Sequence, residues 1–175
     1  EWRAIYEAEV NFCQKLVALL EEGECFLSLQ PVYDMSGREL LYSEALLRFS
    51  GKGARVNIQR AITSFERTGQ IRLIDRYVVN AVIDRLQQDS TSVIACNISA
   101  MSFNCDFWWE SALRSLKNNP DIANRLIIEL TEGAMVENPA AFLKFANKIK
   151  SLGVRFALDD FGAGMPRAAI ISVFT

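Results

Sequence analysis

The sequence predicts an α/β fold: the N-terminal part of a TIM-like (β/α) barrel, with about five of its eight strands and therefore an incomplete barrel. Three observations predict it. Short apolar runs alternate with helical segments, an oxygen-bearing side chain follows each run, and the 175 residues are fewer than the roughly 250 that eight strand–helix units need. Buried parallel strands read as continuous apolar runs, and in such barrels the chemistry lies where the strands end.

The chain begins with a predicted amphipathic helix over residues 1–22. Two strands are expected next, at Phe26–Leu29 and Leu40–Ser43, and the turn Asp34–Gly37 between them predicts a hairpin-like pair. The apolar residues of the helix recur at helical spacing: Trp2, Ile5, Tyr6, Cys13, Leu16, Val17 and Leu20.

Helices and strands alternate through the rest of the chain. Two helices are expected first, one that contains Ile58 and Phe65 and ends near Gly69, and one over Ile71–Gln88. The alternation beyond them predicts parallel βαβ units with right-handed crossovers. Their elements are a strand ending at Asn97, a helix around Phe107–Leu116, a strand ending at Glu129, a helix around Ala140–Leu152 and a strand ending at Asp159.

Composition excludes several classes of function. Nineteen Lys and Arg against 21 Asp and Glu give a net charge of −2, which does not favour wrapping a DNA or RNA polymer or lying on an anionic membrane. No apolar run is long enough to span a bilayer. The four cysteines show no CxxC pairing, so we expect reduced thiols and a cytoplasmic location, either alone or as the cytoplasmic portion of a larger membrane-bound protein. They are Cys13, Cys25, Cys96 and Cys105.

Oxygen-bearing side chains follow the apolar runs, which suggests a ring of ligands at one rim of a barrel. The chain contains no histidine, so a metal ion held there would be a hard cation bound by oxygen. Another interpretation stays open, because acidic residues after strands also cap helix N-termini and an Asn near a Ser is typical of a turn. The oxygen-bearing residues that follow the apolar runs are Gln30, Glu44, Asn97, Glu129, Asp159 and Asp160.

The segment Glu44-Ala45-Leu46-Leu47-Arg48 resembles the signature of the EAL domain family, the bacterial cyclic-di-GMP phosphodiesterases. Four supporting blocks stand in the family's order, and the resemblance extends over residues 25–164 of a single domain that spans 1–175, with a divergent tail over 165–175. The supporting blocks are Gln30-Pro31-Val32, Asn97-Ile98-Ser99, Glu129-Leu130-Thr131-Glu132 and Asp159-Asp160-Phe161-Gly162-Ala163-Gly164.

The resemblance implies a role for each matching residue. Glu44, Asp159 and Asp160 would be catalytic, and with Asn97 and Glu129 they would hold two Mg²⁺ or Mn²⁺ ions. Three further residues would support the substrate or the site: Gln30 and Arg48 would contact the substrate, and Glu132 would anchor the loop that begins at Asp160. The alternative for Arg48 is that it only balances the charge of Glu44, four residues away.

The expected function is hydrolysis of cyclic-di-GMP to linear pGpG by water activated by two metal ions, in bacterial second-messenger signalling. The segment Met165–Arg167 replaces the serine-bearing part of the family pattern, and later family positions are missing, which suggests truncation and impaired catalysis. The alternative is a catalytically inactive module that binds nucleotide or another protein. We also expect a homo-oligomer, formed through the open barrel edge or through the loop after Asp160.

Overall fold

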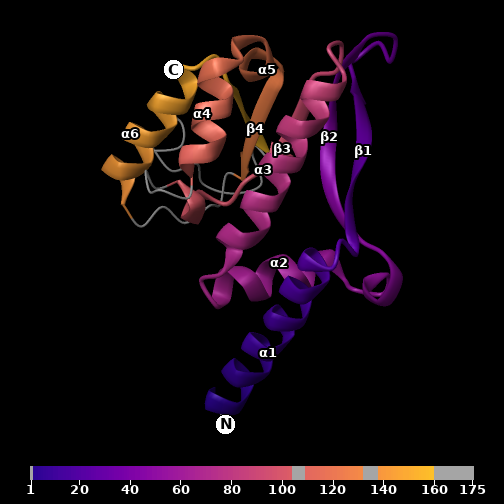
Figure 1. Cartoon of the computed structure of the whole chain (residues 1–175), viewed down its shortest axis with the longest axis vertical. Helices are drawn as coiled ribbons and strands as arrows, with labels where there is room; N and C mark the ends of the chain where they lie inside the picture. The colour runs from indigo at the N-terminus through magenta and orange to yellow at the C-terminus, as the bar shows by residue number, and fades with distance from the viewer. Residues whose placement is uncertain (1, 104–108, 132–137, 160–175) are drawn as a thin grey trace.

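The computed structural model describes residues 2–103, 109–131 and 138–159 (Figure 1). Six helices, two short 3₁₀ turns and five strands are assigned within these residues. In chain order they are α1 (Trp2–Glu21), β1 (Cys25–Tyr33), β2 (Leu40–Phe49), η1 (Gly51–Gly53), α2 (Ile58–Arg67), α3 (Ile71–Gln88), β3 (Ile94–Asn97), η2 (Ala100–Ser102), α4 (Glu110–Asn118), α5 (Pro120–Arg125), β4 (Leu126–Thr131), α6 (Pro139–Lys150) and β5 (Arg155–Asp159).

The strands form one sheet in the order β1-β2-β3-β4-β5. β1 and β2 pair antiparallel, as the predicted hairpin requires, whereas β2 to β5 are parallel to one another. A parallel-rich sheet of five strands with helices between them confirms the predicted α/β class. Within the described residues β5 pairs with β4 alone, so it is an edge of the sheet there.

One face of the sheet carries the helices and most of the core. Residues Ala45, Leu47 and Phe49 alternate along β2 and are buried, and α3 packs against β2 and β3 with its apolar side (Figure 1). Burying each large apolar side chain contributes about 1.5–3 kcal/mol, which offsets the entropy of ordering the chain. The largest fully buried aromatic side chains are Phe65, Phe103, Trp109, Phe142 and Phe145.

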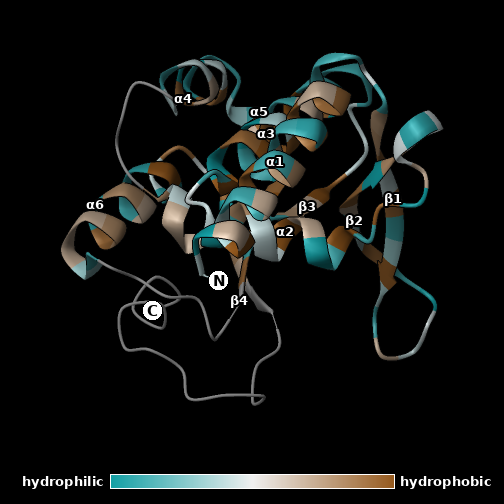
Figure 2. Ribbon diagram, turned by 90° about the horizontal axis from the view of Figure 1, so that it is seen from below, coloured by the Kyte–Doolittle hydropathy of each residue, from teal (hydrophilic) through white to brown (hydrophobic). Residues whose placement is uncertain are grey.

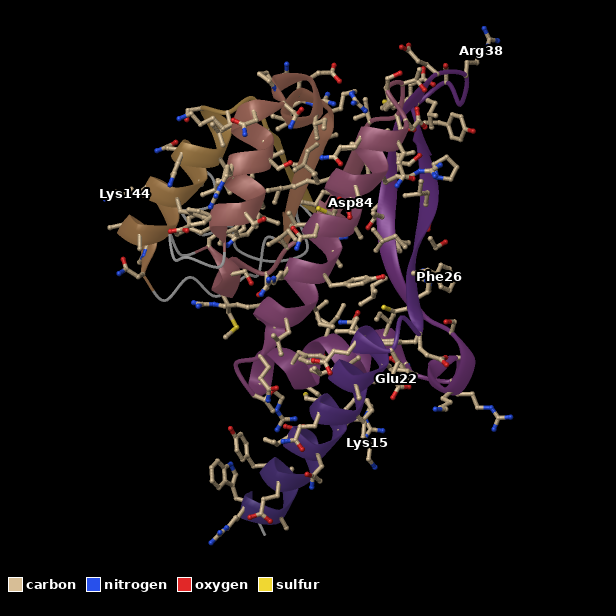
Figure 3. All side chains as sticks on the ribbon, in the orientation of Figure 1. Lys15, Glu22, Phe26, Arg38, Asp84 and Lys144 are labelled. Carbon is tan, nitrogen blue, oxygen red and sulfur yellow. The ribbon has the colours of Figure 1, made fainter. Side chains whose placement is uncertain are left out.

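Charged side chains lie on the outside of this assembly. Arg38 extends from the tip of the β1–β2 hairpin, and Asp84 and Lys144 lie on the outer sides of α3 and α6 (Figure 3). Viewed from below, α1 to α6 gather on one side of the strands (Figure 2). Among the described residues, Glu44, Asn97 and Glu129 lie on the other side of the sheet.

Arg125, the last residue of α5, connects three segments at one end of the sheet. Its guanidinium donates to the carbonyls of Leu86 (2.9 Å), Asp89 (2.8 Å) and Ser92 (3.0 Å), and it pairs with Asp121 at 2.7 Å. Leu86 belongs to the last turn of α3, where carbonyls lack partners within the helix. Arg125 thus caps α3, holds the segment before β3 and stands directly before β4.

Several sequence-predicted boundaries were wrong. Gln30 and Glu44 lie inside β1 and β2, since β1 continues to Tyr33 and β2 to Phe49. The apolar runs before them are only the first halves of the strands. The second half of β2 alternates between half-buried and buried residues, because only one of its faces meets the helices, whereas the second half of β1 is mostly exposed.

Other boundaries differ by a few residues. β4 continues two residues past Glu129, to Thr131. The helix expected around Phe107–Leu116 begins at Glu110 and reaches Asn118, with Phe107 outside the described residues. The short α5 was not expected, and Pro120 at its start fits the missing N–H of a first helical position.

Two predictions from composition can be compared with the described residues. Cys13, Cys25 and Cys96 are free, as expected, and are buried, whereas Cys105 lies outside the described part of the chain. Among the described helices, none combines the length and apolarity that a membrane crossing requires.

Candidate functional site

Glu44 and Asn97 meet on the face of the sheet that the helices leave open. Glu44 lies on β2 opposite Ala95 of β3, and Asn97 follows two residues later on the same face of β3. The Asn97 amide nitrogen Nδ2 donates to Glu44 Oε1 over 2.6 Å. Both side chains are half-buried. With its nitrogen bonded to Glu44, Asn97 has its oxygen Oδ1 as the atom suited to a cation.

Glu129 joins these two residues from the next strand. It lies on β4 directly opposite Asn97 and is 6% exposed. The hydroxyl of Tyr42, on β2, donates to Glu129 Oε1 over 3.1 Å. Burial of a carboxylate is unfavourable unless hydrogen-bond donors compensate for lost water, and Tyr42 supplies one. Glu44, Asn97 and Glu129 therefore share one face across three neighbouring strands.

The fourth expected ligand, Asp159, is the last residue of β5. Its backbone pairs in register with Thr131, two residues past the pairing of Ala157 with Glu129. The backbone of Asp159 therefore lies two residues nearer the carboxyl ends of the strands than the backbone of Glu129. Asp160 and Glu132 lie outside the described residues.

The two expected substrate-contacting residues lie on the same hairpin. Gln30 of β1 pairs in register with Glu44 and is exposed. Arg48 lies four residues past Glu44 on β2, which places it on the same face of the strand, and its Nη1 donates to the Leu47 carbonyl over 2.9 Å. The salt bridges found among the described residues do not include Arg48 with Glu44, so simple charge balance between them is not observed there.

Asp75 supports the turn after Asn97, and sequence reasoning did not select it. It lies on α3, is 3% exposed, and its Oδ2 accepts hydrogen bonds from Ser99 N (3.1 Å) and from the Ser102 hydroxyl. Burial raises the pKa of Asp75 to about 7, although both hydrogen bonds act in the opposite direction. Asp75 thereby fixes the turn that follows Asn97.

The donor chemistry of this face fits a hard divalent cation. Carboxylate and amide oxygens are the ligands that Mg²⁺ and Mn²⁺ prefer. Within the described ranges, no three His, Cys, Asp or Glu side chains gather closely enough to hold a metal ion. Glu44 and Glu129 supply two carboxylates there, and Asn97 adds an amide.

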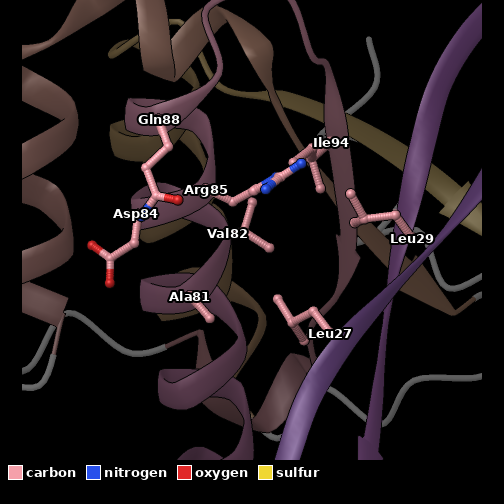
Figure 4. A pocket seen from close by; sticks show the side chains of 8 residues that line it. All are labelled: Leu27, Leu29, Ala81, Val82, Asp84, Arg85, Gln88 and Ile94. Atoms are coloured by element: carbon pink, nitrogen blue, oxygen red, sulfur yellow. The ribbon is translucent and has the colours of Figure 1, made fainter.

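A cavity among the described residues is separate from the site residues. It has a volume of about 480 Å³ and lies on the helix-bearing face, between β1 and α3 (Figure 4). Its walls are mostly apolar, and its charged residues Asp84 and Arg85 come from α3. None of the sequence-predicted site residues lines it. The full lining is Leu27, Leu29, Ala81, Val82, Asp84, Arg85, Gln88 and Ile94.

Solved structures share this fold. The S helix-GGDEF-EAL portion of Vibrio cholerae LapD, bound to c-di-GMP, matches 97% of this chain and 41% of its own, with 20% identity and a TM-score of 0.78. The Xanthomonas citri FimX EAL domain in complex with c-diGMP matches 98% of this chain and 66% of its own, with 20% identity and a TM-score of 0.75. A calcium and cy-diGMP complex of Klebsiella pneumoniae BlrP1 gives a TM-score of 0.61 at 23% identity, over 87% of this chain and 38% of its own. These similarities show that the chain has the fold of EAL domains, a TIM-like barrel, of which it covers a part.

Sequence comparison identifies the family. The probable cyclic di-GMP phosphodiesterase PdeI of Escherichia coli is 27% identical over 91% of this chain, and the cyclic di-GMP phosphodiesterase TpdA of Vibrio parahaemolyticus is 27% identical over 85%. The chain spans 21% of the length of PdeI and 25% of that of TpdA. Residues 13–172 match the EAL domain family, and the chain therefore belongs to it.

Proposed function

We propose that this domain binds cyclic-di-GMP and, with divalent cations, hydrolyses it to linear pGpG. The observation that carries the proposal is the placement of Glu44, Asn97 and Glu129 on one face of three adjacent strands. Three oxygen-bearing side chains there suit a cation that in turn binds a phosphodiester. The relationship to PdeI and TpdA supports cyclic-di-GMP as the substrate.

The proposed ligands of the cations are Glu44, Asn97, Glu129, Asp159 and Asp160, and the cations are Mg²⁺ or Mn²⁺. When bound, two such ions neutralise charge on the phosphodiester and lower the pKa of a water molecule. Glu44 and Glu129 provide negative charge, and their hydrogen-bond donors fix where that charge lies. Glu132 is proposed to anchor the loop that begins at Asp160.

Gln30 and Arg48 are the proposed contacts to the nucleotide. Gln30 is exposed beside Glu44, and its amide can donate to a base or a phosphate. Arg48 carries a planar guanidinium with five N–H donors, a group that suits phosphate oxygens, and its described bond to Leu47 uses Nη1. Both residues come from the β1–β2 hairpin, so the substrate would lie along its inner face.

A second candidate function is a cyclic-di-GMP receptor that does not hydrolyse its ligand. The similarity to LapD and FimX, whose structures hold c-di-GMP, supports binding as a function in its own right. Gln30 and Arg48 would serve such a receptor as they serve the enzyme. Hydrolysis, by contrast, needs the cations and therefore Glu44.

Two measurements on one preparation separate these functions: calorimetric titration with cyclic-di-GMP, and its turnover in Mg²⁺ or Mn²⁺. Hydrolysis that is lost in Glu44→Gln and kept in Glu7→Gln, an exposed residue of α1, supports the phosphodiesterase. Binding without turnover selects the receptor. A chain that neither binds nor hydrolyses cyclic-di-GMP contradicts both.

We further propose that the domain works in the bacterial cytoplasm and self-associates, through the β5 edge or the loop after Asp160. The open edge within the described residues supports the first route, because unpaired strand edges favour pairing with another chain. Sedimentation velocity over a range of protein concentrations tests it. A sedimentation coefficient that stays at the monomer value contradicts self-association.

A further inference from the structure

Tyr42 is a polar residue of the open sheet face that the family signature does not contain. It lies on β2 two residues before Glu44, so the two side chains share a face of the strand. Its ring is half-buried, and its hydroxyl reaches across β3 to Glu129 Oε1 at 3.1 Å. On β3 the residue opposite Glu44 is Ala95, whose small side chain leaves room for this crossing.

The type of donor matters for what Glu129 can do. A buried carboxylate needs hydrogen bonds, but an Arg or Lys donor would also cancel its charge and compete with a cation. A tyrosine hydroxyl is a neutral donor, so its hydrogen bond holds one oxygen of Glu129 without adding a positive charge to the site. Asn97 stands in the same relation to Glu44, with its neutral amide donating at 2.6 Å.

We propose that Tyr42 is a positioning residue that orients the Glu129 carboxylate for a divalent cation. This inference rests on the proposed function, which makes Glu129 a ligand. In metal sites the groups that hydrogen-bond the ligands fix their orientation, and removing one typically weakens metal binding by about 10–100-fold. Tyr42 links β2 to β4 across the site, so one hydroxyl connects the strands that carry Glu44 and Glu129.

The test is Mn²⁺ binding to the whole chain, measured by the loss of the free-ion paramagnetic resonance signal. Tyr42→Phe removes the hydroxyl and keeps the ring, and we expect about tenfold weaker Mn²⁺ binding. Tyr33→Phe, on the exposed end of β1, is the matched control and should bind as the unaltered chain does. Glu129→Gln should weaken binding further, and adding Tyr42→Phe to it should change nothing more.

A second measurement follows the tyrosine absorbance when Mn²⁺ is added. Loss of packing alone would not produce a change that depends on Mn²⁺. Mn²⁺ should change the near-ultraviolet absorbance of tyrosine in the unaltered chain and in Tyr33→Phe, and this change should disappear in Tyr42→Phe. The unaltered chain gives this signal even if the variant fails to fold, and its absence there contradicts the proposal.

The outcomes distinguish the inference from the function on which it rests. If Glu129→Gln weakens Mn²⁺ binding and Tyr42→Phe does not, the positioning role of Tyr42 is wrong and the metal site stands. If the unaltered chain and Glu129→Gln bind Mn²⁺ equally, Glu129 is not a ligand and the positioning role of Tyr42 is wrong. If neither binds Mn²⁺, the proposed metal site is overturned as well.

Discussion

Asn97 and Glu44 come from neighbouring parallel strands, and the Asn97 amide donates to the Glu44 carboxylate over 2.6 Å. A neutral donor at this position keeps a second negative charge away from Glu44. The bond joins the middle of β2 to the last residue of β3, so it links the family signature to the turn that follows Asn97.

Asn97→Asp should lower the thermal stability of the chain in the absence of a cation, and added Mn²⁺ should restore it. Two half-buried carboxylates in hydrogen-bond contact repel each other by about 1–2 kcal/mol, which corresponds to a fall in Tm of roughly 2–8 °C for a domain of this size. Thermal denaturation with and without MnCl₂ measures the effect. Asn11→Asp, exposed in the middle of α1, is the control and should not respond to Mn²⁺. A variant whose Tm is the same in both buffers contradicts the expected cation site.

Asp75 should make the chain less stable as the pH rises from about 4 to about 7. Its pKa in the folded chain is about 7, and the ordinary pKa of an aspartate is 3.8, so the folded state holds the proton over this interval and the unfolded state releases it. The contribution is complete below pH 3.8 and is lost by the time the pH passes 7. Glu66 and Cys96 also face this carboxyl group, and the negative charge of Glu66 helps to raise the pKa.

Asp75→Asn should flatten this dependence, on the order of 2–4 kcal/mol over the interval. Urea unfolding at intervals between pH 4 and pH 8 measures it. Asp84→Asn, exposed on the same helix, should leave the slope unchanged. Equal slopes for Asp75→Asn and the unaltered chain would show that Asp75 ionises normally.

Arg125→Lys should lower the free energy of unfolding by about 2–4 kcal/mol. The guanidinium side chain is 12% exposed and donates to three backbone carbonyls, and a lysine ammonium cannot match that planar arrangement. Chemical denaturation measures the loss, and Arg114→Lys on the exposed side of α4 should change it little. A loss below 0.5 kcal/mol, the range of ordinary surface substitutions, would show that water replaces these bonds.

Trp109→Phe should destabilise the chain by about 2–3 kcal/mol, because it leaves a cavity and removes a hydrogen bond. Trp109 is 1% exposed, and its Nε1 donates to the Ser102 carbonyl at 2.7 Å. Trp2→Phe, at a residue 76% exposed, is the matched control. Tryptophan fluorescence during denaturant unfolding measures the midpoint of each variant. Similar unfolding midpoints for Trp109→Phe and Trp2→Phe would contradict a buried role for Trp109.

Much of the fold could be predicted because periodicity reports burial directly. The helix Ile71–Gln88 agrees at both ends, since buried apolar residues recur along most of its length. The second halves of β1 and β2 were missed because only one of their faces meets the helices, so the apolar run stops before the strand does. α5 was missed because six residues are too few for a helical period to appear.

The candidate site could be predicted in part. Glu44, Asn97 and Glu129 were recognised from their order along the chain, and register brings them onto one face. Tyr42 was not recognised, because a tyrosine in a strand usually reads as packing, although its spacing of two from Glu44 indicates a shared face. Asp75 was not recognised either, since a helical aspartate normally faces water, and the loop partners that bury it are 24 and 27 residues away.

The contacts of Arg125 have a consequence for the opposite end of the sheet. They tie the exit of α3 and the approach to β3 to the residue directly before β4, so the start of β3 is held beside the start of β4. The alignment of Asn97 with Glu129 depends on how these two strands are held. The strands would thus be ordered before an ion or nucleotide binds, and little of the binding free energy would be needed to order them.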